Sequence, residues 1–105
     1  MNQKHSLYTV AAVIVTYHPD LERLREQLTQ IEPQVDQIFV IDNGSNNSQD
    51  IHATTASAKH TRAILCSKNF GLGHAHNLGI RESRIAGMNA VLLLDQDSIP
   101  EGNMV

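Results

Sequence analysis

Four short apolar runs recur along the chain, and each leads into a polar segment. They are Val10–Val15, Ile38–Ile41, Ala63–Cys66 and Ala90–Leu94. A run that is apolar at successive positions is typical of a strand buried on both faces, as in a parallel sheet that helices cover on each side. The pattern therefore predicts four buried strands.

The segments between these runs are suited to helices. Apolar residues at intervals of three and four predict an amphipathic helix from Leu21 to Ile31. Asp20 precedes it as an expected N-cap, and Pro33 is expected to end it. The Ala-rich segment Gln49–Ala58 is a weaker helical candidate.

A third helix is expected from about Ala75 to Ala86, with Ala75, Leu78 and Ile85 on or near one face. Gly79 lies inside this helix, where glycine costs about 1 kcal/mol relative to alanine. We expect that it allows close packing on the sheet. Strands alternating with helices predict an α/β fold: an open, mainly parallel sheet with helices on both faces.

The composition and net charge of the chain argue against some classes of protein. The chain has 105 residues, enough for one domain, and a formal net charge of −3, which argues against a general nucleic-acid surface. Cys66 is the only cysteine, so no intrachain disulfide can form and a reducing compartment fits. No apolar stretch approaches the roughly 20 residues of a membrane span. We expect a cytoplasmic protein, with an association with the inner face of the plasma membrane left open for the full-length protein.

Each predicted strand is followed by residues that could bind a ligand. The four exits are Thr16-Tyr17-His18-Pro19, Asp42-Asn43-Gly44-Ser45, Ser67-Lys68-Asn69-Phe70-Gly71-Leu72-Gly73 and Asp95-Gln96-Asp97. Ligands of open α/β sheets bind beyond the carboxyl ends of the strands. We therefore expect these four segments to meet along one edge.

Asp95 and Asp97 are separated by one residue, so their side chains can point the same way from an extended chain. Two such carboxylates repel each other unless a cation lies between them. Mg²⁺ binds carboxylate oxygens together with substrate phosphates, which predicts a metal site here. The alternative is a solvated acidic turn after a strand.

The other exits carry candidates of their own. Asp42 can accept the ring N–H of a pyrimidine or a ribose hydroxyl, or it can be an ordinary turn residue. Gly71 and Gly73 can let a ligand approach the backbone, or they can only shape the loop. His76 is a candidate contact for a phosphate or a sugar, whereas its spacing from His74 does not suit a zinc site.

These motifs together resemble a known family. Four segments occur in the order found in family 2 glycosyltransferases: Val13-Ile14-Val15-Thr16-Tyr17, Val40-Ile41-Asp42-Asn43-Gly44-Ser45, Asn69-x-Gly71-x-Gly73-x-x-x-Asn77-x-Gly79 and Leu94-Asp95-Gln96-Asp97-Ser98. The last of them looks most like bacterial rhamnosyltransferases that build O-antigen and other cell-surface polysaccharides.

The resemblance implies a GT-A fold with strand order 3-2-1-4, an inverting mechanism and a nucleotide-sugar donor, dTDP-rhamnose or a UDP-sugar. Thr16 and Tyr17 would line the base pocket and Asp42 would bind the base. Asp95 would approach the ribose or the sugar and, with Asp97, bind Mg²⁺ or Mn²⁺. The remaining donor-site residues implied by the resemblance are Asn43, Asn69, Gly71, Gly73, His76 and Asn77.

Two departures from the family pattern affect this interpretation. His76 stands where many members have arginine, which replaces a permanent cation by one that titrates near neutral pH. Members of the family are also about twice as long or longer. We therefore expect residues 1–105 to be a single nucleotide-sugar-binding domain, the N-terminal part of a longer enzyme, with the acceptor site and the catalytic base beyond Val105.

This interpretation predicts that the chain binds nucleotide but transfers little or no sugar, and that a glycan or lipid-linked acceptor is bound by the missing region. It also predicts self-association through the exposed sheet edge at Val91–Leu94. A different class remains open: a non-catalytic α/β module that binds a nucleotide or a protein.

Overall fold

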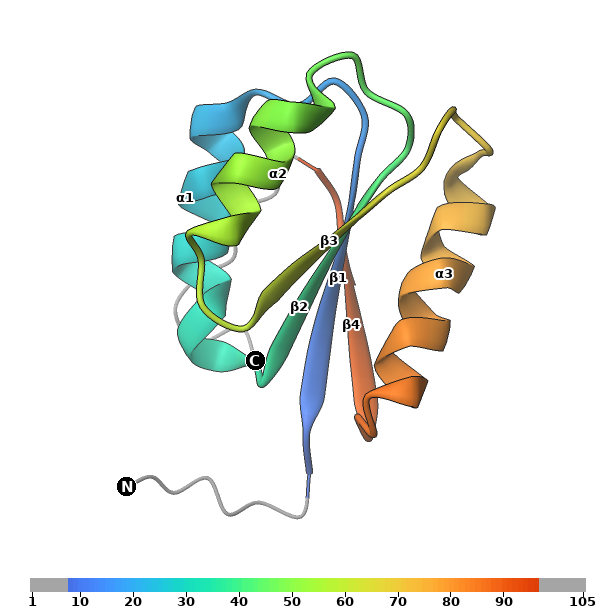
Figure 1. Cartoon of the computed structure of the whole chain (residues 1–105). Helices are drawn as coiled ribbons and strands as arrows, with labels where there is room; N and C mark the ends of the chain where they lie inside the picture. The colour runs from blue at the N-terminus through green and yellow to red at the C-terminus, as the bar shows by residue number, and fades with distance from the viewer. Residues whose placement is uncertain (1–7, 97–105) are drawn as a thin grey trace.

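The computed structural model describes residues 8–96, which form one four-stranded sheet with helices on both sides (Figure 1). The elements in chain order are β1 (Val10–Thr16), α1 (Leu21–Ile31), the short 3₁₀ helix η1 (Glu32–Gln34), β2 (Gln37–Asp42), α2 (Ser48–Ala56), β3 (Thr61–Leu65), α3 (Leu72–Ile85) and β4 (Ala90–Leu94). All four predicted strands and all three predicted helices are thus confirmed.

The sheet is parallel throughout, in the order β3-β2-β1-β4. Ala12 of β1 lies opposite Ile38 of β2 on one side and Leu92 of β4 on the other. This confirms both the predicted fold class and the predicted strand order. Because every strand runs the same way, the four carboxyl ends meet at one edge, which is the upper edge in Figure 1.

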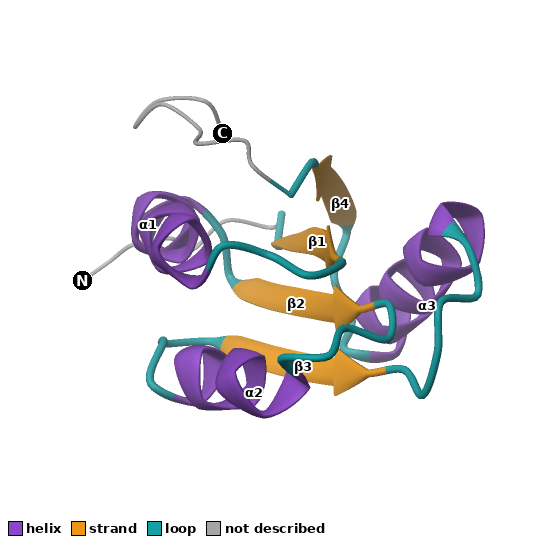
Figure 2. Cartoon of the chain, turned by 90° about the horizontal axis from the view of Figure 1, so that it is seen from above, coloured by secondary structure: helices purple, strands orange, loops and turns teal. Residues whose placement is uncertain are grey.

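The two faces of the sheet are covered differently (Figure 2). On one face α1 and α2 cover a core that includes Ile14 and Val40. On the other face, α3 is the one described helix that packs on Val13, Phe39 and Ile41. Successive strand residues contribute to opposite cores, which is why the strands are apolar at nearly every position.

The predicted N-cap of α1 is confirmed. The Asp20 Oδ1 atom accepts hydrogen bonds from the backbone N–H groups of Glu22, at 2.9 Å, and Arg23, at 3.3 Å. Pro33 lies in η1, so the α-helix gives way to one 3₁₀ turn before the chain enters β2. Proline fits there because the first turn of a helix leaves its N–H groups unpaired.

The third helix ends where it was predicted to end but differs from the prediction at its start and in one residue of its packed face. It begins at Leu72 rather than near Ala75, so that Gly73 lies in its first turn and not in the preceding loop. Ile85 was expected on the packed face, but it is 70% exposed. The expectation for Gly79 holds: a Cβ atom there would collide with the Val13 side chain, so glycine lets the helix lie directly on β1.

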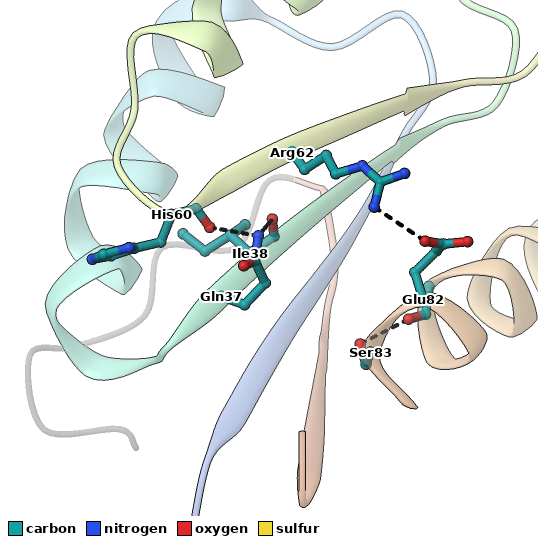
Figure 3. Close-up of polar contacts among 7 residues, drawn as sticks. Gln37, Ile38, His60, Arg62, Glu82 and Ser83 are labelled. Carbon is teal, nitrogen blue, oxygen red and sulfur yellow. Dashed lines mark hydrogen bonds and ion pairs between the residues drawn. The ribbon is translucent and has the colours of Figure 1, made fainter. Parts of the chain in front are cut away.

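Polar contacts at the amino-terminal half of the sheet support this packing (Figure 3). The Arg62 guanidinium of β3 forms an ion pair with the Glu82 carboxylate of α3 at 3.2 Å. The backbone carbonyl of His60 accepts hydrogen bonds from the Ile38 N–H, at 2.7 Å, and the Gln37 side chain, at 3.0 Å. The carboxyl-terminal half of α3 and the start of β3 are therefore tied together at the amino-terminal end of the sheet.

β4 lies at an edge of the sheet formed by the described residues, and Leu93 is 43% exposed there. The expected self-association through Val91–Leu94 stays a prediction. Within residues 8–96, no helix combines the length and the apolar character needed to span a bilayer.

Candidate active site at the carboxyl edge of the sheet

A pocket of about 300 Å³ lies where the strands end. It is lined by residues at the ends of β1 and β4, by the loops that follow β1, β2, β3 and β4, and by the first two turns of α3. These residues are Val15, Thr16, Tyr17, Asn43, Asn69, Leu72, His76, Leu94, Asp95 and Gln96. The expected convergence of polar segments at one edge is therefore observed among the described residues.

Asp42 lies beneath this pocket and is 0% exposed. Its Oδ1 atom accepts hydrogen bonds from the hydroxyl groups of Thr16, at 2.8 Å, and Ser45, at 2.5 Å. Its Oδ2 atom accepts a third from the Ser45 N–H at 2.8 Å. Thr16 is the register partner of Asp42 across β1 and β2, so strand pairing itself brings the first two groups together.

The same cluster fixes the loop after β1. The His18 N–H donates to the Ser45 hydroxyl oxygen at 2.7 Å, and the His18 Nδ1 atom accepts from the Asn46 N–H at 3.2 Å. His18 has a φ of 49°, and its ring contacts the Tyr17 ring in a tilted arrangement, with centroids 4.0 Å apart and planes at 45°. The loops after β1 and β2 are thus bound to each other, and Tyr17 is held at the pocket wall.

The loop after β2 also contacts the loop after β3. Gly44 has a φ of 87°, and a Cβ atom there would lie 2.5 Å from the carbonyl carbon of Lys68. The Asn43 side-chain oxygen accepts a hydrogen bond from the Phe70 N–H at 3.1 Å. Asn69 then closes a tight turn by accepting from the Gly71 N–H at 2.7 Å, which leads the chain into α3.

The loop after β4 is fixed at two successive residues. The backbone carbonyl of Asp95 accepts a hydrogen bond from the Gln27 side chain of α1 at 2.7 Å. The Gln96 side-chain oxygen accepts one from the Tyr17 N–H. The Asp95 side chain itself is exposed at the pocket.

The four strand exits and their order along the chain match a known family. The model of the family described as Glycosyl transferase family 2 matches residues 12–105. The chain belongs to glycosyl transferase family 2. It is also 34% identical over 89 residues to the dTDP-rhamnosyl transferase RfbF of Shigella flexneri, an alignment that covers 85% of this chain. The chain spans 29% of the length of that relative.

Membership of glycosyl transferase family 2 confirms the resemblance inferred from the four motifs. Six of the expected donor-site residues line the pocket: Thr16, Tyr17, Asn43, Asn69, His76 and Asp95. Their contact with a nucleotide sugar stays a prediction, but the fold brings them together from every strand end.

Other expected site residues lie elsewhere. Asp42 is buried below the pocket, and its proposed contact with a base stays a prediction, since its side chain already accepts three hydrogen bonds. Gly71 and Gly73 are exposed at the start of α3 but do not line the pocket. Asn77 lines a separate hollow with His74, Leu78 and Arg81. Asp97 lies outside the described residues.

Four residues that line the pocket were not predicted as individual site residues: Val15, Leu72, Leu94 and Gln96. Val15 and Leu94 were predicted as strand residues, and nothing in an apolar run distinguishes its last member as a pocket wall. Gln96 could have been predicted as a pocket residue, because it lies between Asp95 and Asp97 in the segment that follows the fourth strand. Leu72 was missed because the start of α3 was placed three residues too late.

The described residues of this glycosyl transferase family 2 chain contain no group of three or more His, Cys, Asp and Glu side chains that could hold a metal ion. Asp95 is the only carboxylate among the described pocket residues and is suited to be one oxygen ligand. The metal site expected at Asp95 and Asp97 therefore stays a prediction.

Cys66 follows β3 and lies half-buried beside Asp42, whose backbone carbonyl accepts a hydrogen bond from the Cys66 N–H at 2.8 Å. Burial raises the pKa of the Cys66 thiol above its ordinary value, and the negative charge of Asp42 raises it further. The thiol is therefore a poor nucleophile at neutral pH.

Proposed function

We propose that this chain binds the donor of a glycosyltransferase reaction and that the donor is dTDP-rhamnose. The observation that carries the proposal is the pocket at the carboxyl edge, to which the loops after all four strands contribute. Support for the donor comes from the family and from 34% identity to a dTDP-rhamnosyl transferase. Because the chain spans 29% of that relative, the proposal concerns donor binding first.

In this proposal the base lies against the wall formed by Thr16 and Tyr17. The Tyr17 ring is held by its tilted contact with the His18 ring, so that its orientation is prepared before a ligand arrives. Asn43 and Asn69 offer amide groups to the ribose and the diphosphate. His76, in the second turn of α3, faces the same space and can donate a hydrogen bond to a phosphate oxygen.

The charge of the pocket predicts a need for a cation. A nucleotide diphosphate is strongly anionic, and the exposed Asp95 carboxylate opposes it. Asp95 and Asp97 would hold Mg²⁺ or Mn²⁺, which would neutralise the diphosphate and stabilise it as a leaving group. Asp95 would then orient the donor instead of repelling it.

We further propose an inverting transfer to a glycan or lipid-linked acceptor of a cell-surface polysaccharide, carried out on the cytoplasmic side of the membrane. An inverting displacement needs a base opposite the leaving group. We assign that base, and the acceptor site, to residues outside this chain. The chain alone is then expected to bind the donor and to transfer little or no sugar.

Calorimetric titration of dTDP and UDP into the 105-residue chain, with and without Mn²⁺, tests the proposal. We expect dTDP to bind at least about tenfold more tightly with Mn²⁺ present, since a cation must offset the repulsion at Asp95. Asp97→Ala should abolish this gain, whereas the control Glu26→Ala, which removes an exposed carboxylate from α1, should keep it. Binding that is indifferent to Mn²⁺ would instead support a non-catalytic nucleotide-binding module.

We also propose that two copies of the chain associate along β4, whose outer edge is unpaired among the described strands. Leu93→Lys places a charge at an exposed apolar position of that edge and should shift the protein to monomer in analytical ultracentrifugation. Leu65→Lys makes the same change at the opposite edge strand and serves as the control. A wild-type chain that stays monomeric at millimolar concentration would contradict this part of the proposal.

A further inference from the structure

Gln27 is a polar residue at a position where α1 is otherwise apolar. It is 0% exposed and lies in the buried stripe with Leu24, Leu28 and Ile31. An amide group taken out of water costs free energy unless its polar atoms find partners. A fully buried glutamine in the middle of a helix therefore requires an explanation.

Half of the Gln27 amide is paired and half is not. Its Nε2 atom donates to the backbone carbonyl of Asp95 at 2.7 Å, across 68 positions of the sequence. Its Oε1 atom is buried and has no hydrogen-bond partner among the described residues. The fold thus retains an unpaired acceptor, which a methionine or leucine of similar size would avoid.

The hydrogen bond that Gln27 makes reaches a residue that lines the pocket. Asp95 is the first residue after β4 and the first residue of the acidic segment. On the other side of this segment, the Gln96 side chain accepts from the Tyr17 N–H. The backbone is therefore held from α1 and from the β1 loop, while the Asp95 carboxylate stays exposed at the pocket.

We propose that Gln27 is a positioning residue that fixes the backbone at Asp95 and so directs the Asp95 carboxylate into the donor pocket. This inference rests on the proposed function for the purpose of the fixed carboxylate. The hydrogen bond to the loop, not the stability of the helix, is the reason for a buried amide at this position.

The structure suggests a variant that separates these two roles. Gln27→Met keeps the length of the side chain and suits a helix, removes the donor to Asp95, and also removes the unpaired Oε1 atom. The hydrogen bond from Gln27 to the Asp95 carbonyl is only partly buried, so a water molecule can replace the amide as its donor. We therefore expect the urea midpoint of unfolding to stay level or rise, although the loop loosens.

Amide hydrogen exchange of the full chain measures the loop without any ligand. We expect exchange at residues 94–96 to be about five- to tenfold faster in Gln27→Met than in wild type, the change that one hydrogen bond of ordinary net strength provides. Gln30→Met makes the same substitution at an exposed position of α1 and should leave this exchange unchanged. Equal exchange in Gln27→Met and wild type overturns the inference.

Titration with dTDP gives the second readout. Gln27→Met should weaken binding about five- to tenfold in the presence of Mn²⁺ and leave the weaker metal-free binding unchanged, because only the former needs a fixed Asp95. A variant that binds like wild type under both conditions contradicts the role in donor binding. If exchange changes as expected but wild type shows no Mn²⁺-dependent binding, the loop assignment stands and the proposed function is wrong.

Discussion

The two halves of the pocket rim differ in how they use their polar residues. In the half formed by the loops after β1 and β2, Asp42 and Ser45 are buried and bonded to each other. In the half formed by the loops after β3 and β4, Asn69 and Asp95 are exposed. A carboxylate at a strand end thus organises loops in one half and is available to a ligand in the other.

The position of the strands explains the difference. β1 and β2 are the central strands of the described sheet, with neighbours on both sides, whereas β3 and β4 lie at its edges. Loops that leave central strands are surrounded by other loops, so their polar groups must bond to one another. Loops at the edges have fewer neighbours and leave polar groups open.

Removing the buried Asp42 carboxylate should have the largest effect among the substitutions that test the difference between the two halves of the rim. Asp42→Ala leaves the Thr16 hydroxyl, the Ser45 hydroxyl and the Ser45 N–H without an acceptor inside the structure. We expect the free energy of unfolding to fall by about 3 kcal/mol, the order expected when buried donors lose their partner. Urea denaturation followed by circular dichroism measures this change.

Glu26→Ala is the matched control, since Glu26 is an exposed carboxylate on α1. Its effect on unfolding should stay within about 0.5 kcal/mol. If Asp42→Ala cost no more than this control, Asp42 would not organise the loops, and the division of the rim into two halves would be wrong.

Gly44 is where the two halves meet, and its substitution should have the next largest effect. Gly44→Ala combines a φ of 87° with a Cβ atom 2.5 Å from the Lys68 carbonyl carbon. We expect a loss of about 2 kcal/mol in the free energy of unfolding, because backbone strain and overpacking act together. The atoms that this Cβ atom would meet belong to the backbone of Lys68 and Asn69, so they cannot move away without shifting the loop after β3.

Gly73→Ala provides the contrast. Gly73 lies in the first turn of α3, and a Cβ atom there has open space around it. Alanine should therefore stabilise the helix, by up to about 1 kcal/mol. Thermal unfolding of both variants should give shifts of opposite sign, and a shift of the same sign in both would refute this account of Gly44.

The fold could be predicted closely from the sequence because its signals are local. The apolar runs are strands, and Asp20 caps the first helix as its position before the stripe indicates. The start of α3 was placed late because Gly73 and His74 suggest a loop. The helix begins earlier because the Asn69 side chain closes the preceding turn and the Gly71 carbonyl accepts a hydrogen bond from the Ala75 N–H at 3.2 Å, contacts that the propensity of single residues does not contain.

The candidate site was predictable as a set of strand ends but not in its detail. Periodicity places Asp42 and Asp95 equally at a carboxyl edge, and only the completed fold shows that one is buried and the other exposed. Gln27 was not singled out, because the acceptor of its hydrogen bond lies 68 positions away. Partners brought together by the sheet are invisible to a scan along the chain.

Asp95→Asn tests whether the exposed carboxylate serves ligand binding and not stability. The substitution removes a charge from the pocket but breaks no side-chain bond among the described residues, so the free energy of unfolding should change by less than about 0.5 kcal/mol. Binding of dTDP with Mn²⁺ should weaken about tenfold, or about 1.4 kcal/mol. Glu26→Gln, which neutralises an exposed carboxylate on α1, should leave both quantities unchanged. A large loss of stability in Asp95→Asn would place Asp95 with Asp42 among the structural residues.

Cys66 offers the smallest and most local probe of the buried half. Burial, and then the charge of Asp42, raise the pKa of the thiol, so the folded chain keeps this proton at a pH where the unfolded chain loses it. Stability should consequently decrease slightly as pH rises above about 8.5, the ordinary value for cysteine. Cys66→Ala removes this decrease and isolates it from other titrating groups.

The rate of alkylation of Cys66 against pH measures the same quantity directly. Its midpoint should lie above that of the chain unfolded in urea, and Asp42→Asn should lower it only part of the way, because burial is the larger cause. A midpoint that does not change in Asp42→Asn would contradict the second cause and leave burial alone to raise the pKa of the thiol.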